Sequence, residues 1–161
     1  MPGVRTNCVT KKLPLHVEFT ECTERSNPFI PFFLSFFMEK FVIASKNAGE
    51  VEAIVTDENP ETAKKVLAAM PFKGKANFWG EEIYFEIAVE TSLENGKEFV
   101  NVGDVAYWPE GRCLCIFFGK TLSSVDERPK AYSPVNVFAR VKRADIFKNV
   151  KEGEEIVVRR H

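Results

Sequence analysis

Two stretches of the chain decide its fold: VEAIVTDENPETAKKVLAAM at residues 51–70 and GDVAYWPEGRCLCIFFGKT at residues 103–121. The first predicts a strand, a turn and a short helix, because Asn59 is a suitable N-cap and Pro60 suits the first helical position. Apolar residues then recur with the helical period at Ala63, Val66, Leu67 and Met70. The second stretch predicts a β-hairpin whose second arm is apolar on both faces, which is typical of a central strand.

Strand patterns continue on both sides of these stretches. Further strands are predicted at 41–45, 51–56, 81–90, 99–102, 133–142 and 156–159, with a helical turn at 145–150. Within 133–142 one face is predicted to carry Val135, Val137, Ala139 and Val141, and the other Asn136, Phe138, Arg140 and Lys142. We therefore expect a mainly β fold, a small closed antiparallel β-barrel with one or two short helices.

The totals favour an ordinary globular protein. The 161 residues carry 22 basic and 23 acidic side chains, so no basic excess attracts nucleic acid or an anionic membrane. Four cysteines do not make a disulfide framework, which indicates a reducing, cytoplasmic setting. The apolar run PFIPFFLSFF at 28–37 is interrupted by prolines and is shorter than the roughly 20 residues of a membrane span.

The pattern of the chain changes at Met38. Residues 1–37 show no sustained helical or strand period, whereas 38–161 is well patterned to its end. We expect a domain over 38–161, preceded by an extension at 1–37 that is poorly ordered or not native. The alternative is that this aromatic extension packs on a partner, because exposed clusters of phenylalanine are unusual.

Several motifs in the body resemble the cyclophilin superfamily, and more closely the compact cyclophilin-like barrel proteins of archaea and thermophilic bacteria. Pro60, Thr62 and Ala63 match the Pro-x-Thr-Ala motif that opens the first helix of the family, and Lys73-Gly74 matches the turn that follows. NFWGEEIYF at 77–85 is similar to a segment of the compact group, and SPVNVFARV resembles the last core strand. The resemblance covers about residues 40–142 and implies a barrel with a peptide groove on its side.

Cyclophilins are peptidyl-prolyl isomerases in which an arginine polarises the proline amide, and the residues for this chemistry are mostly missing here. No arginine lies between Arg25 and Arg112, so Arg112 is the one catalytic candidate. The groove glutamine and the pocket phenylalanine of the family fall on Cys113 and Cys115. The residues 122–132 hold neither the Trp nor the His of the usual pocket.

The candidate binding residues are those that the resemblance or the strand pattern places around the groove: Trp79, Tyr84, Trp108, Cys113, Cys115, Phe117, Phe118 and Asn136. The two tryptophans suit either a groove floor or the ends of a barrel. Glu82 and Tyr84 share one strand face, which fits a polar ligand but fits a solvated outer face better. The two cysteines fit a soft metal less well than they fit small apolar positions in the core.

The sequence therefore predicts a cyclophilin-like binding protein that holds a peptide or small ligand in a groove without the usual arginine. The alternative is a weak peptidyl-prolyl isomerase, so whether the chain is an enzyme stays open. A homodimer through a strand edge or the N-terminal extension is a third hypothesis. No phosphate loop or dinucleotide motif is present and the two histidines are His16 and His161, so we expect no cofactor and no metal.

Overall fold

The computed structural model describes residues 10–12, 18–20 and 39–161, and the chain divides into two units at Met38. In the first unit β1 (Thr10–Lys12) pairs antiparallel with β2 (Glu18–Thr20). The sequence does not predict these two short strands. Most of the predicted extension at 1–37, including the aromatic run at 28–37, lies outside the described residues.

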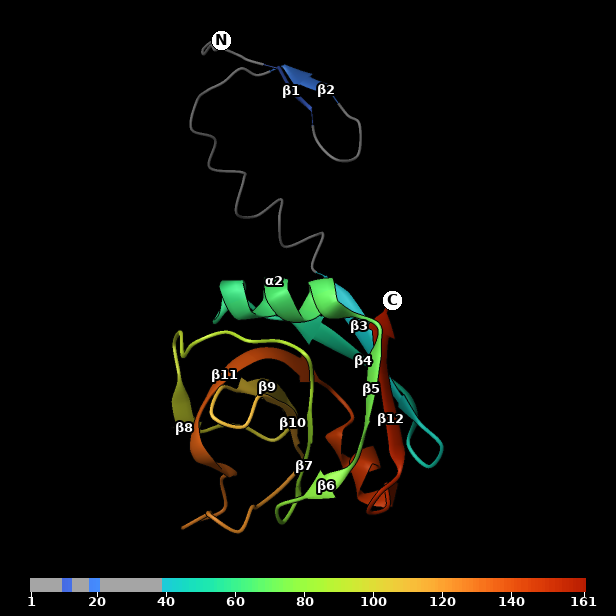
Figure 1. Ribbon diagram of the computed structural model, residues 1–161, viewed down its shortest axis with the longest axis vertical. Coiled ribbons are helices and arrows are strands. Elements are labelled where there is room, and N and C mark those ends of the chain that lie inside the picture. The colour runs from blue at the N-terminus through green and yellow to red at the C-terminus, as the bar shows by residue number, and fades with distance from the viewer. Residues whose placement is uncertain (1–9, 13–17, 21–38) are drawn as a thin grey trace. The chain divides into compact units, whose positions relative to one another are not determined.

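The second unit, residues 39–161, is built on one antiparallel sheet (Figure 1). Its strands are β3 (Lys40–Ser45), β4 (Gly49–Val55), β5 (Phe72–Lys75), β6 (Asn77–Phe78), β7 (Glu82–Glu86), β8 (Lys97–Phe99), β9 (Asp104–Trp108), β10 (Cys113–Phe117), β11 (Lys130–Val141) and β12 (Glu155–Arg160). The order of hydrogen-bonded neighbours is β5-β12-β3-β4-β11-β9-β10-β7-β6, and β8 pairs with β11. The mainly β expectation is confirmed, while β5 and β6 are strands that the sequence analysis missed.

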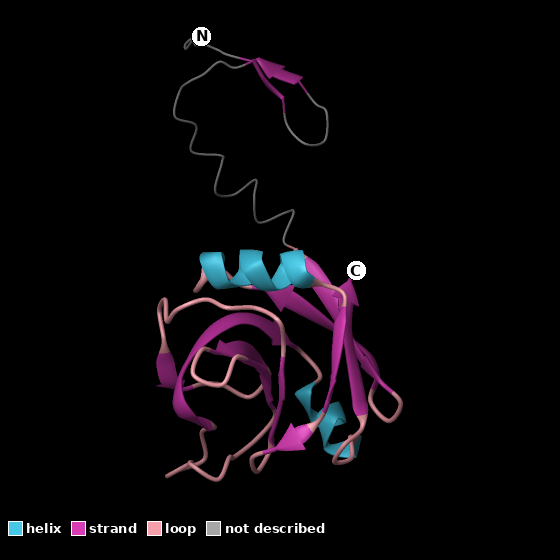
Figure 2. Ribbon diagram, in the orientation of Figure 1, coloured by secondary structure: helices cyan, strands magenta, loops and turns pink. Residues whose placement is uncertain are grey.

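Two helices lie at opposite ends of the curved sheet, α2 (Pro60–Ala69) and the 3₁₀ helix η1 (Ala144–Asn149) (Figure 2). Helix α2 begins at Pro60 as predicted, but the side chain of Asn59 does not cap it. The cap comes from a distant residue, because the Glu94 carboxylate accepts hydrogen bonds from the backbone N–H groups of Glu61 (3.2 Å) and Thr62 (3.1 Å). A carboxylate at this position also complements the positive end of the helix dipole.

The sheet buries an apolar cluster on each of its faces. The main cluster lies between the sheet and α2, and the buried face of α2 is the stripe predicted from the sequence, with Ala63, Val66 and Leu67 at its centre. The second cluster lies on the other face of β7, β10, β9 and β11 and consists of Val100, Ala106, Cys113, Cys115, Phe117, Ala131, Val135 and Val137. All residues of β10 are buried, so the central position predicted for this strand is confirmed.

A β-bulge in β11 corrects one prediction. Val137 pairs with Ala106 and Ala139 with Val105, so two steps along β11 oppose one step along β9. Because of this irregularity both Phe138 and Ala139 lie in the main cluster, whereas Val135 and Val137 lie in the second cluster. The Phe138 ring stacks on Phe41 at 6.0 Å. Strict alternation wrongly put Val135 and Val137 on one face with Ala139 and Val141, and Phe138 opposite the core, because a bulge breaks the two-residue period.

The predicted closed barrel is not formed by hydrogen bonds between the described strands. The ladder ends at β5 on one side and at β6 on the other, and no register joins β5 to β7 in residues 39–161. Side-chain packing takes the place of a ladder at this seam, because the Phe85 ring lies against the backbone of β5. A Cβ on Gly74 would stand 2.3 Å from that ring. The backbone N–H of Ala76, between β5 and β6, donates instead to the carbonyl of Glu154.

Candidate functional site

Four aromatic side chains meet next to the second apolar cluster. Their rings contact one another edge to face in the order Trp79–Tyr132–Trp108–Tyr84, with centroid distances of 5.7, 6.0 and 6.5 Å and interplanar angles of 87°, 80° and 86°. We call these four residues the aromatic row. Tyr132 is 64% exposed and the other three are half-buried, so the row is an aromatic surface that solvent reaches.

Hydrogen bonds and backbone contacts fix the two tryptophans of the row. The Trp79 indole N–H donates to Ser123 Oγ at 3.1 Å, and the Trp108 indole N–H donates to Ser133 Oγ at 2.6 Å. The Trp108 ring also lies over Gly111, where a Cβ would stand 2.3 Å from it. Both polar groups of the indoles are therefore satisfied and the rings present their apolar surfaces in fixed directions.

Glu82 lies on the same face of β7 as Tyr84 and is buried, with 6% of its surface exposed. This corrects the sequence analysis, which favoured a solvated face for Glu82. Its Oε1 atom is buried and has no hydrogen-bond partner among the described residues. Burial raises the pKa of Glu82 from 4.5 to about 7, and a hydrogen bond with the Cys115 thiol opposes part of this shift. A carboxyl group near its pKa at neutral pH is therefore enclosed beside the aromatic row.

The two cysteines of β10 are buried in the second apolar cluster, as their core interpretation requires. Burial raises the pKa of Cys113 from 9 to about 11, and the charges of Glu86 and Glu82 add to the shift. Burial also raises the pKa of Cys115 well above its ordinary value, and Glu82 contributes again. Both thiols are therefore protonated and weakly nucleophilic at neutral pH. The described residues hold no group of three or more side chains suited to a metal ion.

Phe117 and Phe118 do not share one groove. Phe117 is buried in the second cluster, whereas Phe118 belongs to the main cluster, where it packs against Phe78 and Phe147. Consecutive residues of a strand point to opposite faces, so a face that carries Phe117 excludes Phe118.

Asn136 is fully buried, and its amide is engaged in holding other elements together. Its Nδ2 donates to Thr62 Oγ1 and to the Ser92 carbonyl, both at 3.0 Å, and its Oδ1 accepts the Glu94 N–H at 2.9 Å. These bonds tie β11 to α2 and to the loop before β8. Asn136 therefore has both amide hydrogens and its oxygen in use within the fold.

Arg112 has a left-handed backbone conformation with φ at 54°, and its side chain is paired with two carboxylates. Its Nη1 contacts Glu90 and its Nη2 lies 3.6 Å from Glu86. The guanidinium is thus held at the end of β7 that lies beyond Tyr84, away from Glu82. Phe117 is fully buried, so its ring is not an exposed pocket wall that this guanidinium could face.

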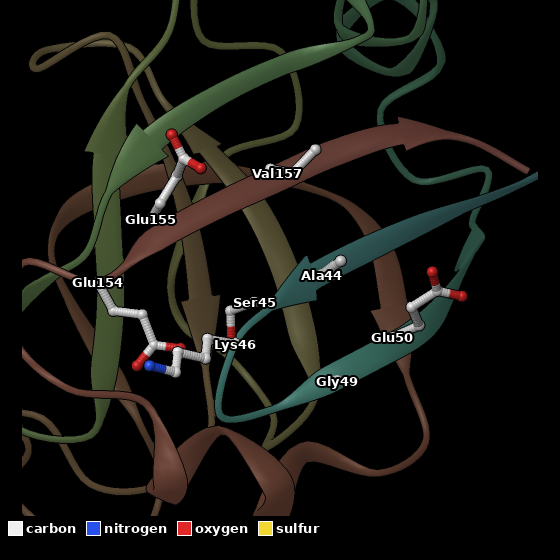
Figure 3. Close-up of a pocket in the computed structure, with 8 residues that line it drawn as sticks. All are labelled: Ala44, Ser45, Lys46, Gly49, Glu50, Glu154, Glu155 and Val157. Atoms are coloured by element: carbon white, nitrogen blue, oxygen red, sulfur yellow. The ribbon is translucent and has the colours of Figure 1, made fainter.

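A surface hollow away from this site lies at the β3–β4 hairpin and β12 (Figure 3). Figure 3 shows Ser45, Lys46 and Glu154 together at one end of it. Partial burial raises the pKa of Glu154, but hydrogen bonds from Asn47 and Lys151 outweigh this and lower the pKa to about 2. Because this carboxylate is committed to the hairpin, the hollow offers less chemistry than the aromatic row.

The sequence of this chain is similar to that of a known protein family. The family model for cyclophilin-like proteins matches residues 40–159. The chain belongs to the cyclophilin-like family. This cyclophilin-like chain is 39% identical to the hypothetical protein AF2241 from Archaeoglobus fulgidus, whose solution structure it resembles with a TM-score of 0.67. The match covers 77% of this chain and 95% of the archaeal protein. Among curated proteins, none matches.

The sequence analysis missed two features of the site: the presence of Tyr132 and the burial of Glu82. Tyr132 joins the two tryptophans, but it stands in a stretch without a strong strand period before 133–142. Glu82 alternates with apolar residues, which is the signal of an outer face, and the second cluster that covers that face is built from segments distant in sequence. In the described part of the chain, no helix has the length and apolar character of a membrane span.

Proposed function

We propose that this cyclophilin-like chain is a binding protein that holds a peptide or small ligand on the aromatic row. The observation that carries the proposal is a partly exposed series of four edge-to-face rings whose indole N–H groups are already satisfied. Such a surface offers apolar contact area with little loss of side-chain freedom on binding, which favours affinity.

Exposed apolar side chains near Ser123 support the proposal. Leu122 is 69% exposed and Val125 is 75% exposed, and both belong to the loop that holds the Trp79 indole. Apolar groups exposed beside an aromatic surface are typical of a site that a ligand covers.

The state of Arg112 argues against the alternative of a prolyl isomerase. An arginine that polarises a proline amide must present free N–H groups to the ligand, whereas this guanidinium is paired with Glu86 and Glu90. We therefore expect binding without turnover. The barrier to rotation about the peptide bond, ~18–20 kcal/mol, stays as high as in water without such a group.

The proposal is tested by NMR on the full chain with ¹⁵N-labelled tryptophan, whose two residues both lie in the aromatic row. The probe is the succinylated peptide Ala-Ala-Pro-Phe. We expect saturable shifts of both indole signals, and a loss of affinity of about tenfold in Tyr132→Ala, which removes a mostly exposed ring. Phe99→Ala, which removes an exposed ring outside the row, is the matched control. Unchanged indole signals at millimolar peptide would contradict the proposal for peptides.

A further inference from the structure

Glu82 is an acid without a counter-charge. The neighbouring carboxylates have partners: Glu86 and Glu90 pair with Arg112, and Glu81 lies 3.9 Å from Lys148. None of the ion pairs formed by residues 39–161 includes Glu82. With 6% of the residue exposed, its Oε1 lacks both a donor and solvent. Buried polar atoms are nearly always hydrogen-bonded, so this oxygen calls for a donor from outside the protein.

The surroundings of Glu82 favour a cation. The backbone N–H of Trp79 donates to the Glu82 carbonyl at 2.9 Å, which holds the start of the aromatic row beside the start of β7. Tyr84, at the other end of the row, is two residues along the same strand face. Burial raises the pKa of Tyr84, and the charge of Glu82 adds to the shift, so an ionised Glu82 makes the field here negative. The faces of Trp and Tyr rings attract cations as well.

We propose that Glu82 and the aromatic row bind an organic ammonium group that carries at least one N–H, as found in a small primary amine or a lysine side chain. This inference rests on the function proposed above and names the chemical class of its ligand. Glu82 Oε1 accepts the N–H, and the rings of Trp79, Tyr132 and Trp108 surround the adjoining methylene groups. The Tyr132 ring is 64% exposed, so this part of the aromatic row is open to solvent.

Binding of an ammonium group is coupled to a proton. The titratable groups on the same face as Glu82 are Tyr84 and Glu86 on its own strand and Cys113 and Cys115 on β10. Burial raises the pKa of Tyr84 and of both thiols, so these three stay neutral between pH 5 and 8, and Glu86 pairs with the Arg112 guanidinium. Glu82 changes charge within this range. The ammonium group binds the ionised carboxylate, so its affinity rises by up to about tenfold per pH unit below 7 and levels off above it.

The test uses the tryptophan indole signals of the full chain with n-butylammonium chloride as the probe and n-butanol as its uncharged counterpart. Sodium chloride at equal ionic strength controls for screening. We expect saturable shifts with n-butylammonium at pH 8, binding at least tenfold weaker at pH 5.5, and no saturation with n-butanol. A second arm with N-acetyl-lysine methylamide distinguishes a lysine side chain from a free amine as the source.

Glu82→Gln removes the charge with little change in shape, and Glu81→Gln is the matched control on the preceding residue. We expect Glu82→Gln to weaken n-butylammonium binding at least tenfold at pH 8 and Glu81→Gln to change it less than twofold, with both variants melting cooperatively. Equal binding of n-butanol, or unchanged affinity in Glu82→Gln, overturns the ammonium inference. The function proposed above is tested separately, by its peptide titration. An absence of n-butylammonium shifts beyond the salt control overturns it too.

Discussion

At the scale of single residues, the carboxyl group of Glu82 makes the stability of the fold depend on pH. Its pKa is about 7 in the folded chain against 4.5 ordinarily, so ionisation is disfavoured by folding. The contribution of this group to the free energy of unfolding is therefore largest below about pH 4.5, and about 3 kcal/mol of it is lost as the pH rises to 7. We expect Glu82→Gln to remove that loss, as measured by urea unfolding at pH 5 and pH 8.

Glu86 provides the control for this experiment. Glu86→Gln removes an exposed carboxylate on the same strand and face and leaves the buried Glu82 unchanged. This variant should keep the loss of stability between pH 5 and pH 8. If Glu82→Gln lost as much stability over that interval as the unaltered chain, Glu82 would not be the buried acid described here.

The thiols of Cys113 and Cys115 should react slowly while the chain is folded. Both are buried and protonated at neutral pH, and it is the exposed thiolate that attacks disulfide reagents. In a chain with Cys8→Ser and Cys22→Ser, Ellman's reagent at pH 8 should release colour at least a hundredfold faster in 6 M guanidinium than in buffer. Fast release from the native protein would show that the second cluster is open.

At the scale of elements, Asn136 joins β11, α2 and the loop before β8 through three hydrogen bonds. Asn136→Ala leaves the Glu94 N–H, Thr62 Oγ1 and the Ser92 carbonyl without this partner, and buried unsatisfied groups cost about 1–3 kcal/mol each. We expect a loss of about 3 kcal/mol in the free energy of unfolding, measured by urea denaturation. Asn77→Ala, which removes one exposed side-chain bond to the Tyr84 carbonyl, should cost less than about 1 kcal/mol.

A small effect of Asn136→Ala, equal to that of Asn77→Ala, would mean that the amide is not needed to hold these elements together. Asn136 would then be free to serve a ligand, as the sequence pattern suggests.

The sequence predicts most elements of the second unit because their signals are local. The helix Pro60–Ala69, the hairpin of β9 and β10 and the alternation in β7 are all visible in runs of a few residues. The short strands β5 and β6 are not predicted from the sequence because they are only four and two residues long. The bulge at Phe138 is not predicted because it depends on pairing with β9, more than 30 residues earlier in the chain.

The candidate site is predicted less fully, for the same reason. Trp79, Tyr84 and Trp108 are foreseen from their types and positions, and the structure brings these three together. Tyr132 and the burial of Glu82 depend on which distant segments cover the outer face of β7 and β10, and no period of the sequence encodes that cover. Phe118 and Asn136 match the expected region but serve the packing of other elements.

At the scale of the whole molecule, the division at Met38 predicts that the second unit folds by itself. It contains both apolar clusters and the whole ten-stranded sheet. A chain that starts at Met38 should melt cooperatively, with a midpoint within about 5 °C of the full chain, and keep both indole NMR signals in place. A molten or aggregated fragment would contradict this division of the chain.

The central claim is that this cyclophilin-like chain binds through its aromatic row without isomerase turnover. The most direct test is one NMR sample that contains the chain and the succinylated Ala-Ala-Pro-Phe peptide, in which the indole signals and the cis–trans exchange of the peptide are followed together. The account predicts shifted indole signals and no exchange cross-peaks beyond those of the free peptide. Exchange cross-peaks that vanish in Arg112→Ala would contradict it and make the chain an isomerase.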